Sequence, residues 1–290
     1  MSAGTGSQRA ENSGEIMDWW QALLLGIVQG LTEFLPVSSS GHLMIFREVL
    51  DVDAEGFLDF TVTVHFATVL STIIVFWSAI LKLLKGFFRF RYNDETDYIF
   101  KIIVSMVPIA VVGLFFKDRV EALFEDNLFT VGIFLIVTAV LLFLSDRQKT
   151  DGAAAARPSL PVHRNGISYL QALTVGISQA VAVFPGLSRS GTTIATGLIC
   201  GVKRDVIAQF SFLMVLVPII GEQTLDILKS FSAAEVSGGL GFLPLAVGFI
   251  GAFASGLFAC KAMVSLVKRA KLIWFALYCL IVAGLVFIFA

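Results

Sequence analysis

The sequence predicts an all-α integral membrane protein with an inverted internal repeat, six full transmembrane helices and two re-entrant helical hairpins. Three observations lead to this prediction: an apolar composition, a similarity between the two halves, and an uneven distribution of Lys and Arg. Of the 290 residues, 57% are hydrophobic and only 15% are charged, with a mean hydropathy of +0.85. Soluble domains carry about 25% charged residues, so this composition is typical of a protein that lies in a bilayer.

Charge and cysteine content exclude other classes. The net charge of −1 argues against a nucleic-acid-binding protein, and Cys200, Cys260 and Cys279 lie in apolar stretches without metal-ligand or paired spacing. We therefore read the cysteines as small hydrophobic residues.

Residues 1–16 are polar and show no cleavable signal peptide, so we expect a disordered segment or a cloning remnant there, with Met17 as the native start.

Two apolar regions, 19–46 and 169–200, are each split by Pro, Gly and Ser, and they resemble one another. With a constant offset of 150, QALLLGIVQGLTEFLPVSSSG (21–41) and QALTVGISQAVAVFPGLSRSG (171–191) are identical at ten of 21 positions. Apolar bias alone does not produce this agreement, so we infer an internal duplication. The expected organisation is a first repeat over 17–145, a cytoplasmic linker over 146–168, and a second repeat over 169–290. Each repeat consists of one split region and three spans.

The remaining apolar stretches are long enough, at roughly 17–25 residues, to cross a bilayer as helices. The six predicted spans cover approximately 60–81, 101–116, 128–145, 205–222, 242–264 and 272–289.

Charge sets the orientation of these spans. Most of the 21 Lys and Arg residues lie in four segments: 82–101, 145–168, 201–204 and 261–271. Three other segments hold only four such residues and are rich in Asp and Glu: 47–59, 117–127 and 222–241. By the positive-inside rule the first set is cytoplasmic and the second external. Region 19–46 then begins and ends on the external side of the membrane, and region 169–200 begins and ends on the cytoplasmic side. Secondary transporters place their binding sites at such midplane hairpins.

The turns of the two hairpins predict an anion site. Ser38, Ser39 and Ser40 precede an expected helix start at Gly41, and Ser188, Arg189 and Ser190 precede one at Gly191. Serine is a common helix N-cap, which is the simpler explanation for any one of them. Capping does not explain an arginine at membrane depth, which is costly unless it is paired or functional. Amides at a helix start, hydroxyls and a guanidinium together suit phosphate, and two such helix starts suit a diphosphate. The candidate substrate-binding residues are Gln29, Ser38, Ser40, Gly41, Gly186, Ser188, Ser190 and Thr193.

Glu33 and His42 flank the first turn and indicate a catalytic function. Glu33 is either a paired structural carboxylate or a group that holds a divalent cation or acts as a general base. His42 is either a hydrogen-bonded core histidine or a nucleophile or base. A simple anion binder gains nothing from Glu33 beside its ligand, which favours an enzyme. His65 is a weaker candidate for lining the cavity.

The motifs resemble those of the undecaprenyl-diphosphate phosphatases, the bacitracin-resistance family. QGLTEFLPVSSSGH (29–42) is similar to that family's (E/Q)xxxE motif and the Ser-rich stretch that follows it, and PGLSRSGTT (185–193) is similar to its PGxSRSxxT motif. The similarity runs through nearly the whole chain from Met17. The resemblance implies hydrolysis of undecaprenyl diphosphate to undecaprenyl phosphate and phosphate, for cell-wall glycan synthesis.

By the same resemblance, the catalytic set is Glu33, Ser39, His42 and Arg189. The family requires a divalent cation, expected to be Mg²⁺ or Ca²⁺, with Glu33 and Gln29 as candidate ligands. The site is expected to open at the external face of the bacterial inner membrane, where bacitracin would compete for the substrate. Membrane lipids and a second copy of the chain are further candidate partners. Whether Ser39 or His42 attacks phosphorus is left open.

Two other classes compete with the phosphatase. A polyprenyl-phosphate transporter or flippase would use the same inverted repeat, and it would release no phosphate. A structural scaffold would leave Glu33, His42 and Arg189 unexplained.

Overall fold

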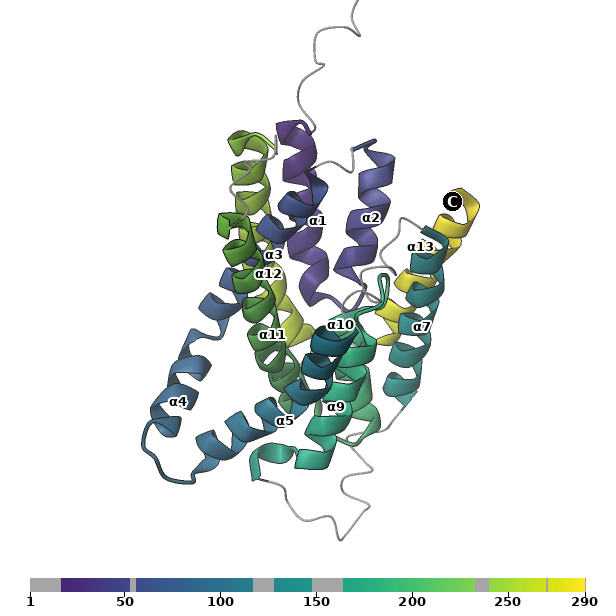
Figure 1. Ribbon diagram of the computed structural model, residues 1–290. Coiled ribbons are helices and arrows are strands. Elements are labelled where there is room, and N and C mark those ends of the chain that lie inside the picture. Colours follow the sequence, from purple (N-terminus) through teal and green to yellow (C-terminus); the bar gives the residue numbers. More distant parts are fainter. Residues whose placement is uncertain are drawn as a thin grey trace, which may run out of the picture.

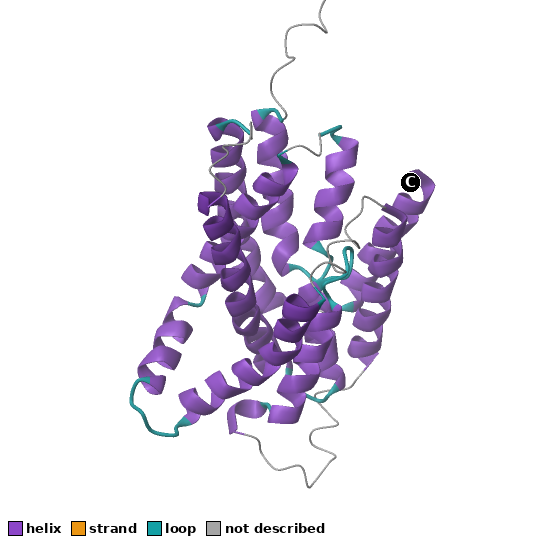
Figure 2. Cartoon of the chain, in the orientation of Figure 1, coloured by secondary structure: helices purple, strands orange, loops and turns teal. Residues whose placement is uncertain are grey.

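The computed structural model describes residues 17–52, 56–116, 128–147, 164–232, 240–269 and 271–289. Across these ranges the chain folds into helices joined by turns, and no strand occurs among them (Figures 1 and 2). The expectation for residues 1–16, and that for most of the linker, falls outside the described residues. The helices of the first half are α1 (Trp19–Phe34), α2 (Ser39–Val49), α3 (Phe57–Val75), α4 (Trp77–Phe87), α5 (Asp94–Phe115) and α7 (Leu128–Arg147). Those of the second half are the short 3₁₀ helix η2 (Arg164–Gly166), α9 (Tyr169–Val181), α10 (Arg189–Ile199), α11 (Arg204–Ser232), α12 (Phe242–Arg269) and α13 (Ile273–Phe289).

Four helices are long and apolar enough to cross a membrane, and they correspond to four predicted spans. In the described part of the chain they are Asp94–Phe115, Leu128–Arg147, Arg204–Gly221 and Phe242–Val267. The predicted span over 272–289 coincides with α13, which is apolar but has only 17 residues. These helices make the chain a multi-pass membrane protein.

The predicted span over 60–81 is not one straight helix. The chain bends by 71° where α3 meets α4, and Phe76 lies at the break. The apolar pattern continues through the bend, but α4 also carries Lys82 and Lys85, which are exposed. Figure 1 shows α4 at the side of the molecule, next to α5.

The two split regions form two helical pairs, as expected. The α1–α2 pair occupies one end of the molecule and the α9–α10 pair the other, with their turns near mid-height (Figure 1). The identity of Gln21 and Gln171 in the repeat has a structural reason, because each side chain bonds the two helices of its own pair together. Gln21 Nε2 donates to Leu50 O at 3.0 Å, and Gln171 Nε2 donates to Cys200 O at 2.9 Å. In both pairs, the first turn of the incoming helix is thereby bonded to the end of the outgoing one.

Each pair packs against a long helix from the other half of the chain. Helix α1 lies along α12, and α9 lies along α5. Gly26 and Gly176, identical in the repeat, allow this close approach. A Cβ atom at Gly26 would lie 2.2 Å from Gly248 O, and one at Gly176 would lie 2.1 Å from Ser105 O. Small residues at helix crossings are the usual means of packing in a membrane, where no hydrophobic force drives helices together.

Candidate active site

The outgoing helix of each pair begins with a serine cap. Ser38 Oγ accepts from Gly41 N at 3.3 Å, and Ser188 Oγ accepts from Gly191 N at 3.1 Å. Helices α2 and α10 therefore begin at Ser39 and Arg189, two residues before the starts predicted from Gly41 and Gly191. The simpler explanation for Ser38 and Ser188 is thus confirmed as part of their role.

The turns of the two pairs touch. Ser190 Oγ donates to Leu35 O at 3.1 Å, which joins the second turn to the first. A Cβ atom at Gly41 would lie 3.3 Å from Gly186 Cα, and one at Gly191 would lie 3.3 Å from Cβ of Pro36. Pro36 and Gly186 occupy equivalent repeat positions, so the two contacts mirror one another. The loops gathered at the centre in Figure 2 include these turns.

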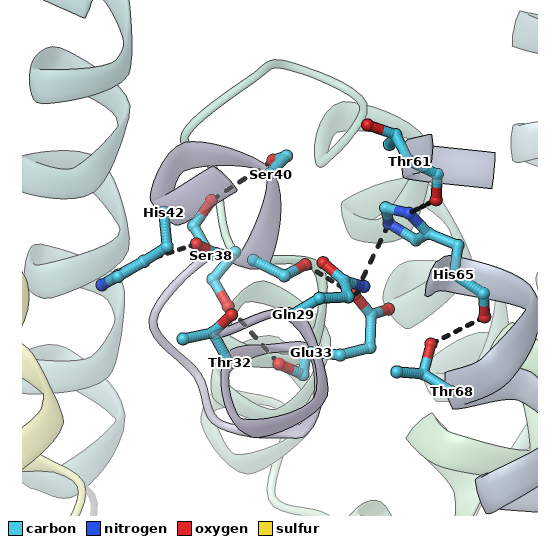
Figure 3. Close-up of polar contacts among 12 residues, drawn as sticks. Gln29, Thr32, Glu33, Ser38, Ser40, His42, Thr61, His65 and Thr68 are labelled. Carbon is cyan, nitrogen blue, oxygen red and sulfur yellow. Dashed lines mark hydrogen bonds and ion pairs between the residues drawn. The ribbon is translucent and has the colours of Figure 1, made fainter. Parts of the chain in front are cut away.

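Glu33 is the centre of a polar cluster (Figure 3). Its Oε2 atom accepts hydrogen bonds from Ser39 Oγ at 2.5 Å and from Gln29 Nε2 at 2.9 Å. His65 Nε2, from α3, lies 3.7 Å from the same oxygen. The i, i+4 spacing of Gln29 and Glu33 puts both on one side of α1, and the turn at Pro36 brings Ser39 back onto Glu33. The structure thus brings together three predicted site residues and one histidine that the sequence indicated only weakly.

Arg189 joins this cluster through a shared cavity. Glu33, Arg189 and Ser190 line a cavity of about 30 Å³ together with Thr68 and Ser211. One water needs roughly 10–15 Å³ of such space, so the cavity has room for about two. A diphosphate is larger, and the side chains around the cavity must therefore move apart to admit one. The carboxylate from the first hairpin and the guanidinium from the second meet only in the folded molecule.

His42 lies away from this cavity. Its Nδ1 is 2.7 Å from Ser38 O and its Nε2 is 2.8 Å from Tyr278 Oη in α13. The His42 and Tyr278 rings are also stacked, with centroids 5.6 Å apart. Figure 3 shows His42 on the opposite side of the first turn from Glu33 and His65. Both alternatives for His42 stay open, although the ring is bonded as a core histidine would be.

The remaining candidates are held by the fold. Thr193 Oγ1 is 2.6 Å from Ser211 Oγ, which ties α10 to α11, and Ser188 N donates to Thr138 Oγ1 of α7 at 3.0 Å. Ser40 Oγ lies 3.4 Å from Ser38 Oγ, and Ser190 Oγ lies 3.4 Å from Ser188 Oγ. Their substrate-binding role stays a prediction, as do the roles of Gly41 and Gly186.

Three residues near the candidate site were not predicted from the sequence. Thr68 and Ser211 line the cavity from α3 and α11, but small hydroxyl residues are frequent in membrane helices and do not single out a site. Tyr278 is a tyrosine within an apolar span, which could have drawn attention to it. Only the fold reveals that its partner is His42.

A divalent cation fits the donors around Glu33. Gln29 is fully buried, and its Oε1 is an acceptor without a hydrogen-bond partner in the described structure. Glu33 adds a carboxylate beside it. No group of three His, Cys, Asp or Glu residues suited to a metal occurs among the described residues. Mg²⁺ is commonly bound by one or two carboxylates together with substrate phosphates, so a small set of protein oxygens is sufficient.

Comparisons with known proteins all identify the same family. The family model described as "Bacitracin resistance protein BacA" matches residues 22–285. A protein of Parabacteroides distasonis named undecaprenyl-diphosphatase is 50% identical over 270 residues, which cover 93% of this chain and 97% of that protein. A protein of Bacteroides fragilis with the same name is 49% identical, covering 92% and 96%. A protein of Carboxydothermus hydrogenoformans, again with that name, is 40% identical, covering 90% and 94%.

Proposed function

The chain belongs to the bacitracin resistance protein BacA family, and on this premise we propose that it is an undecaprenyl-diphosphatase. Its reaction is the hydrolysis of undecaprenyl diphosphate to undecaprenyl phosphate and inorganic phosphate. The observation that carries the proposal is that Glu33 of the first hairpin and Arg189 of the second line one cavity, whose other walls are α3 and α11. A carboxylate can serve hydrolysis of a phosphoric anhydride as a general base, and a guanidinium at the start of a helix can neutralise the phosphoryl charge.

Arg189 and helix α10 supply the binding site for the phosphoryl groups. The first intrahelical bond of α10 runs from Thr192 N to Ser188 O, so the amides of residues 189 and 190 precede the helical ladder. These amides and the positive end of the helix dipole attract phosphate oxygens. The guanidinium adds a planar pair of donors that matches two oxygens of one phosphoryl group. These groups stabilise the charge that develops as the bridging P–O bond breaks.

Ser39 is the favoured nucleophile on the observed geometry. Its hydroxyl donates to Glu33 at 2.5 Å, so Glu33 can accept the proton as Ser39 Oγ forms a bond to the terminal phosphorus. The bond from that phosphorus to the bridging oxygen breaks, and undecaprenyl phosphate leaves. Water then attacks the phosphoserine, releases inorganic phosphate and restores the hydroxyl. Direct attack by a water that Glu33 activates is the alternative at the same carboxylate.

His42 takes no part in these steps in the observed arrangement. The family resemblance includes it in the catalytic set, but Ser38 and Tyr278 hold its ring. A direct role for His42 requires that the ring leave Tyr278 and turn toward the cavity.

A divalent cation, Mg²⁺ or Ca²⁺ by the family resemblance, would be held by Glu33 and Gln29. When bound, it would neutralise phosphate charge and polarise the phosphoryl group.

The proposal extends to the membrane arrangement. We place the first hairpin on the external side of the bacterial inner membrane, with the active site open to that face, and the second hairpin on the cytoplasmic side. Support comes from the paired contacts of Gln21 and Gln171, from the mirrored packing of α1 on α12 and α9 on α5, and from the distribution of Lys and Arg. Six crossings follow if α3 with α4, and α13, each span the bilayer. Bacitracin, in this setting, would compete with the enzyme for undecaprenyl diphosphate.

The mirrored hairpins also favour a second candidate function. Transporters with inverted repeats alternate between two faces around a midplane site, and the turns of α1–α2 and α9–α10 meet in that manner. A polyprenyl-phosphate flippase would move lipid without releasing phosphate.

The deciding experiment measures phosphate release. Purified protein in detergent is given undecaprenyl diphosphate, with and without a chelator. We expect release that the chelator abolishes and that Mg²⁺ restores. Ser39→Ala should lower the rate by about 10²-fold or more. Ser178→Ala in α9 is the matched control, because that hydroxyl bonds only a carbonyl of its own helix, and it should leave the rate unchanged. No phosphate release by the parent protein would refute the enzyme and favour the flippase.

A further inference from the structure

His65 lies in the apolar helix α3, and the proposed reaction gives it no task. Its side chain is only 16% exposed, which is costly for an imidazole unless both ring nitrogens have partners. Nδ1 lies 2.8 Å from Thr61 O, and a carbonyl oxygen can only accept. Nδ1 therefore carries the proton, and in the neutral ring Nε2 is the atom with the free lone pair. This atom faces Glu33 (Figure 3).

The distance between His65 and Glu33 is informative. Nε2 is 3.7 Å from Glu33 Oε2, whereas a charge-assisted hydrogen bond is about 2.7–2.9 Å long. Ligands of one small divalent cation each lie about 2.1 Å from the ion, so two neighbouring ligands are roughly 3–4 Å apart. The separation therefore suits two ligands of one ion better than a direct hydrogen bond.

Gln29 supplies a second, independent observation. Its Nε2 donates to Glu33 Oε2, which fixes the orientation of the amide, because the opposite orientation would put two acceptors together. Its Oε1 is left buried and without a partner in the described structure, as is Oε1 of Gln179 at the equivalent repeat position, but Val183 replaces the carboxylate there. An unsatisfied buried acceptor is destabilising, so an oxygen beside a carboxylate in this position is expected to have a partner in the working protein.

We propose that His65 is a ligand of the divalent cation, with Nε2 as its nitrogen donor beside the oxygens of Glu33 and Gln29. The inference rests on the proposed function for the purpose of the ion, but its evidence is the arrangement of these three side chains. A metal-binding histidine usually donates its other ring N–H to a carbonyl or carboxylate, which is what His65 does to Thr61.

This ligand set has consequences for the choice of metal. An imidazole nitrogen beside one carboxylate and one amide oxygen suits Mn²⁺ better than Mg²⁺ or Ca²⁺, which are bound mainly by oxygens. Of the three proposed ligands, Glu33 lines the cavity that Arg189 also lines, so an ion on the Glu33 carboxylate and the guanidinium would hold a phosphate between them.

The test measures Mn²⁺ bound to the purified full-length protein without substrate. Pulsed electron paramagnetic resonance detects modulation from a nitrogen that is bonded directly to Mn²⁺. We expect imidazole nitrogen modulation in the parent protein, and its loss in His65→Gln together with about tenfold or greater weakening of Mn²⁺ binding. Protein labelled with ¹⁵N-histidine should show the corresponding change of the modulation, which identifies the residue type without any substitution.

His42→Gln is the matched control. His42 is the other histidine near the first turn, but its ring nitrogens are bonded to Ser38 and Tyr278, so its removal should leave the nitrogen modulation intact. Loss of the modulation in this variant would overturn the proposal and make His42 the ligand.

Other outcomes are equally decisive. Mn²⁺ bound to the parent without nitrogen modulation, while phosphate release still depends on the metal, would refute the His65 ligand and leave the phosphatase standing. A parent protein that shows the nitrogen modulation but releases no phosphate would refute the phosphatase and leave the metal site standing.

Discussion

At the scale of single residues, Glu33 has polar neighbours from both hairpins and from α3. Ser39 and Gln29 donate to one of its oxygens, His65 faces the same oxygen, and Arg189 lines the same cavity. Three of the four residues around Glu33 come from the two Ser-rich motifs or their flanks, and the fourth comes from α3.

Glu33→Gln tests the chemistry directly. The amide keeps the size of the side chain but removes the charge and the proton-accepting lone pair. We expect turnover to fall by about 10²-fold or more, the usual scale for loss of a general base. Binding of the lipid diphosphate should persist, because Arg189 and the amides of α10 are unchanged. Phosphate release and lipid binding are measured on the same preparation. Activity within a few-fold of the parent would remove Glu33 from catalysis.

Arg189→Lys separates charge from geometry. Lysine keeps the positive charge but cannot form the planar pair of hydrogen bonds that two phosphate oxygens accept. We expect most of the phosphate-release activity to be lost, while the helical content and the thermal midpoint stay close to those of the parent. A turnover near the normal value would show that the paired donors are unnecessary.

At the scale of helices, the glycines of the repeat mark where the hairpins approach their long partners. Gly176 has no room for a Cβ atom beside Ser105 O, and Gly26 has none beside Gly248 O. The match of Gly26 with Gly176 therefore reflects packing, while the match of Gln21 with Gln171 reflects closure of each helical pair.

Gly176→Ala should destabilise the protein. The added methyl group would lie 2.1 Å from Ser105 O, and relieving such an overlap costs about 1–3 kcal/mol. The control is Gly284→Ala in α13, where nothing lies within 4 Å of the new atom. That change should be neutral or stabilising, because alanine favours a helix interior. Thermal unfolding in one detergent compares the two, and equal midpoints would contradict the close packing of α9 on α5.

Part of this arrangement could be predicted from sequence and part could not. The repeat located both hairpins because its matched Gln, Gly and Ser residues keep a constant spacing. The bend at Phe76 was missed because hydropathy averages over a window and does not register a change of direction. The link between Glu33 and His65 was missed because the two lie on different helices, and so was the link between His42 and Tyr278. Such pairs depend on how helices pack, which no local pattern encodes.

At the scale of the whole molecule, the orientation of the two halves can be tested without a ligand. Single cysteines at Asp51 and Arg91, both exposed, are placed in a protein whose Cys200, Cys260 and Cys279 are replaced by Ala. The proposed topology puts residue 51 outside and residue 91 in the cytoplasm. A membrane-impermeant thiol reagent added to intact cells should label Asp51→Cys, and it should label Arg91→Cys only after the membrane is opened. Labelling of both in intact cells would contradict the inverted arrangement.

The contact between Ser190 and Leu35 also bears on how the protein is made. Glu33 is synthesised early and Arg189 only after more than half of the chain has been made, so the first hairpin is complete before the guanidinium of the second exists. Until the second hairpin arrives, the nascent protein has no complete site and cannot cleave a substrate. The halves should for the same reason behave as complementary fragments: a cut in the segment between Arg147 and Arg164 would leave each part inert alone, and activity would return when both are inserted into the same membrane.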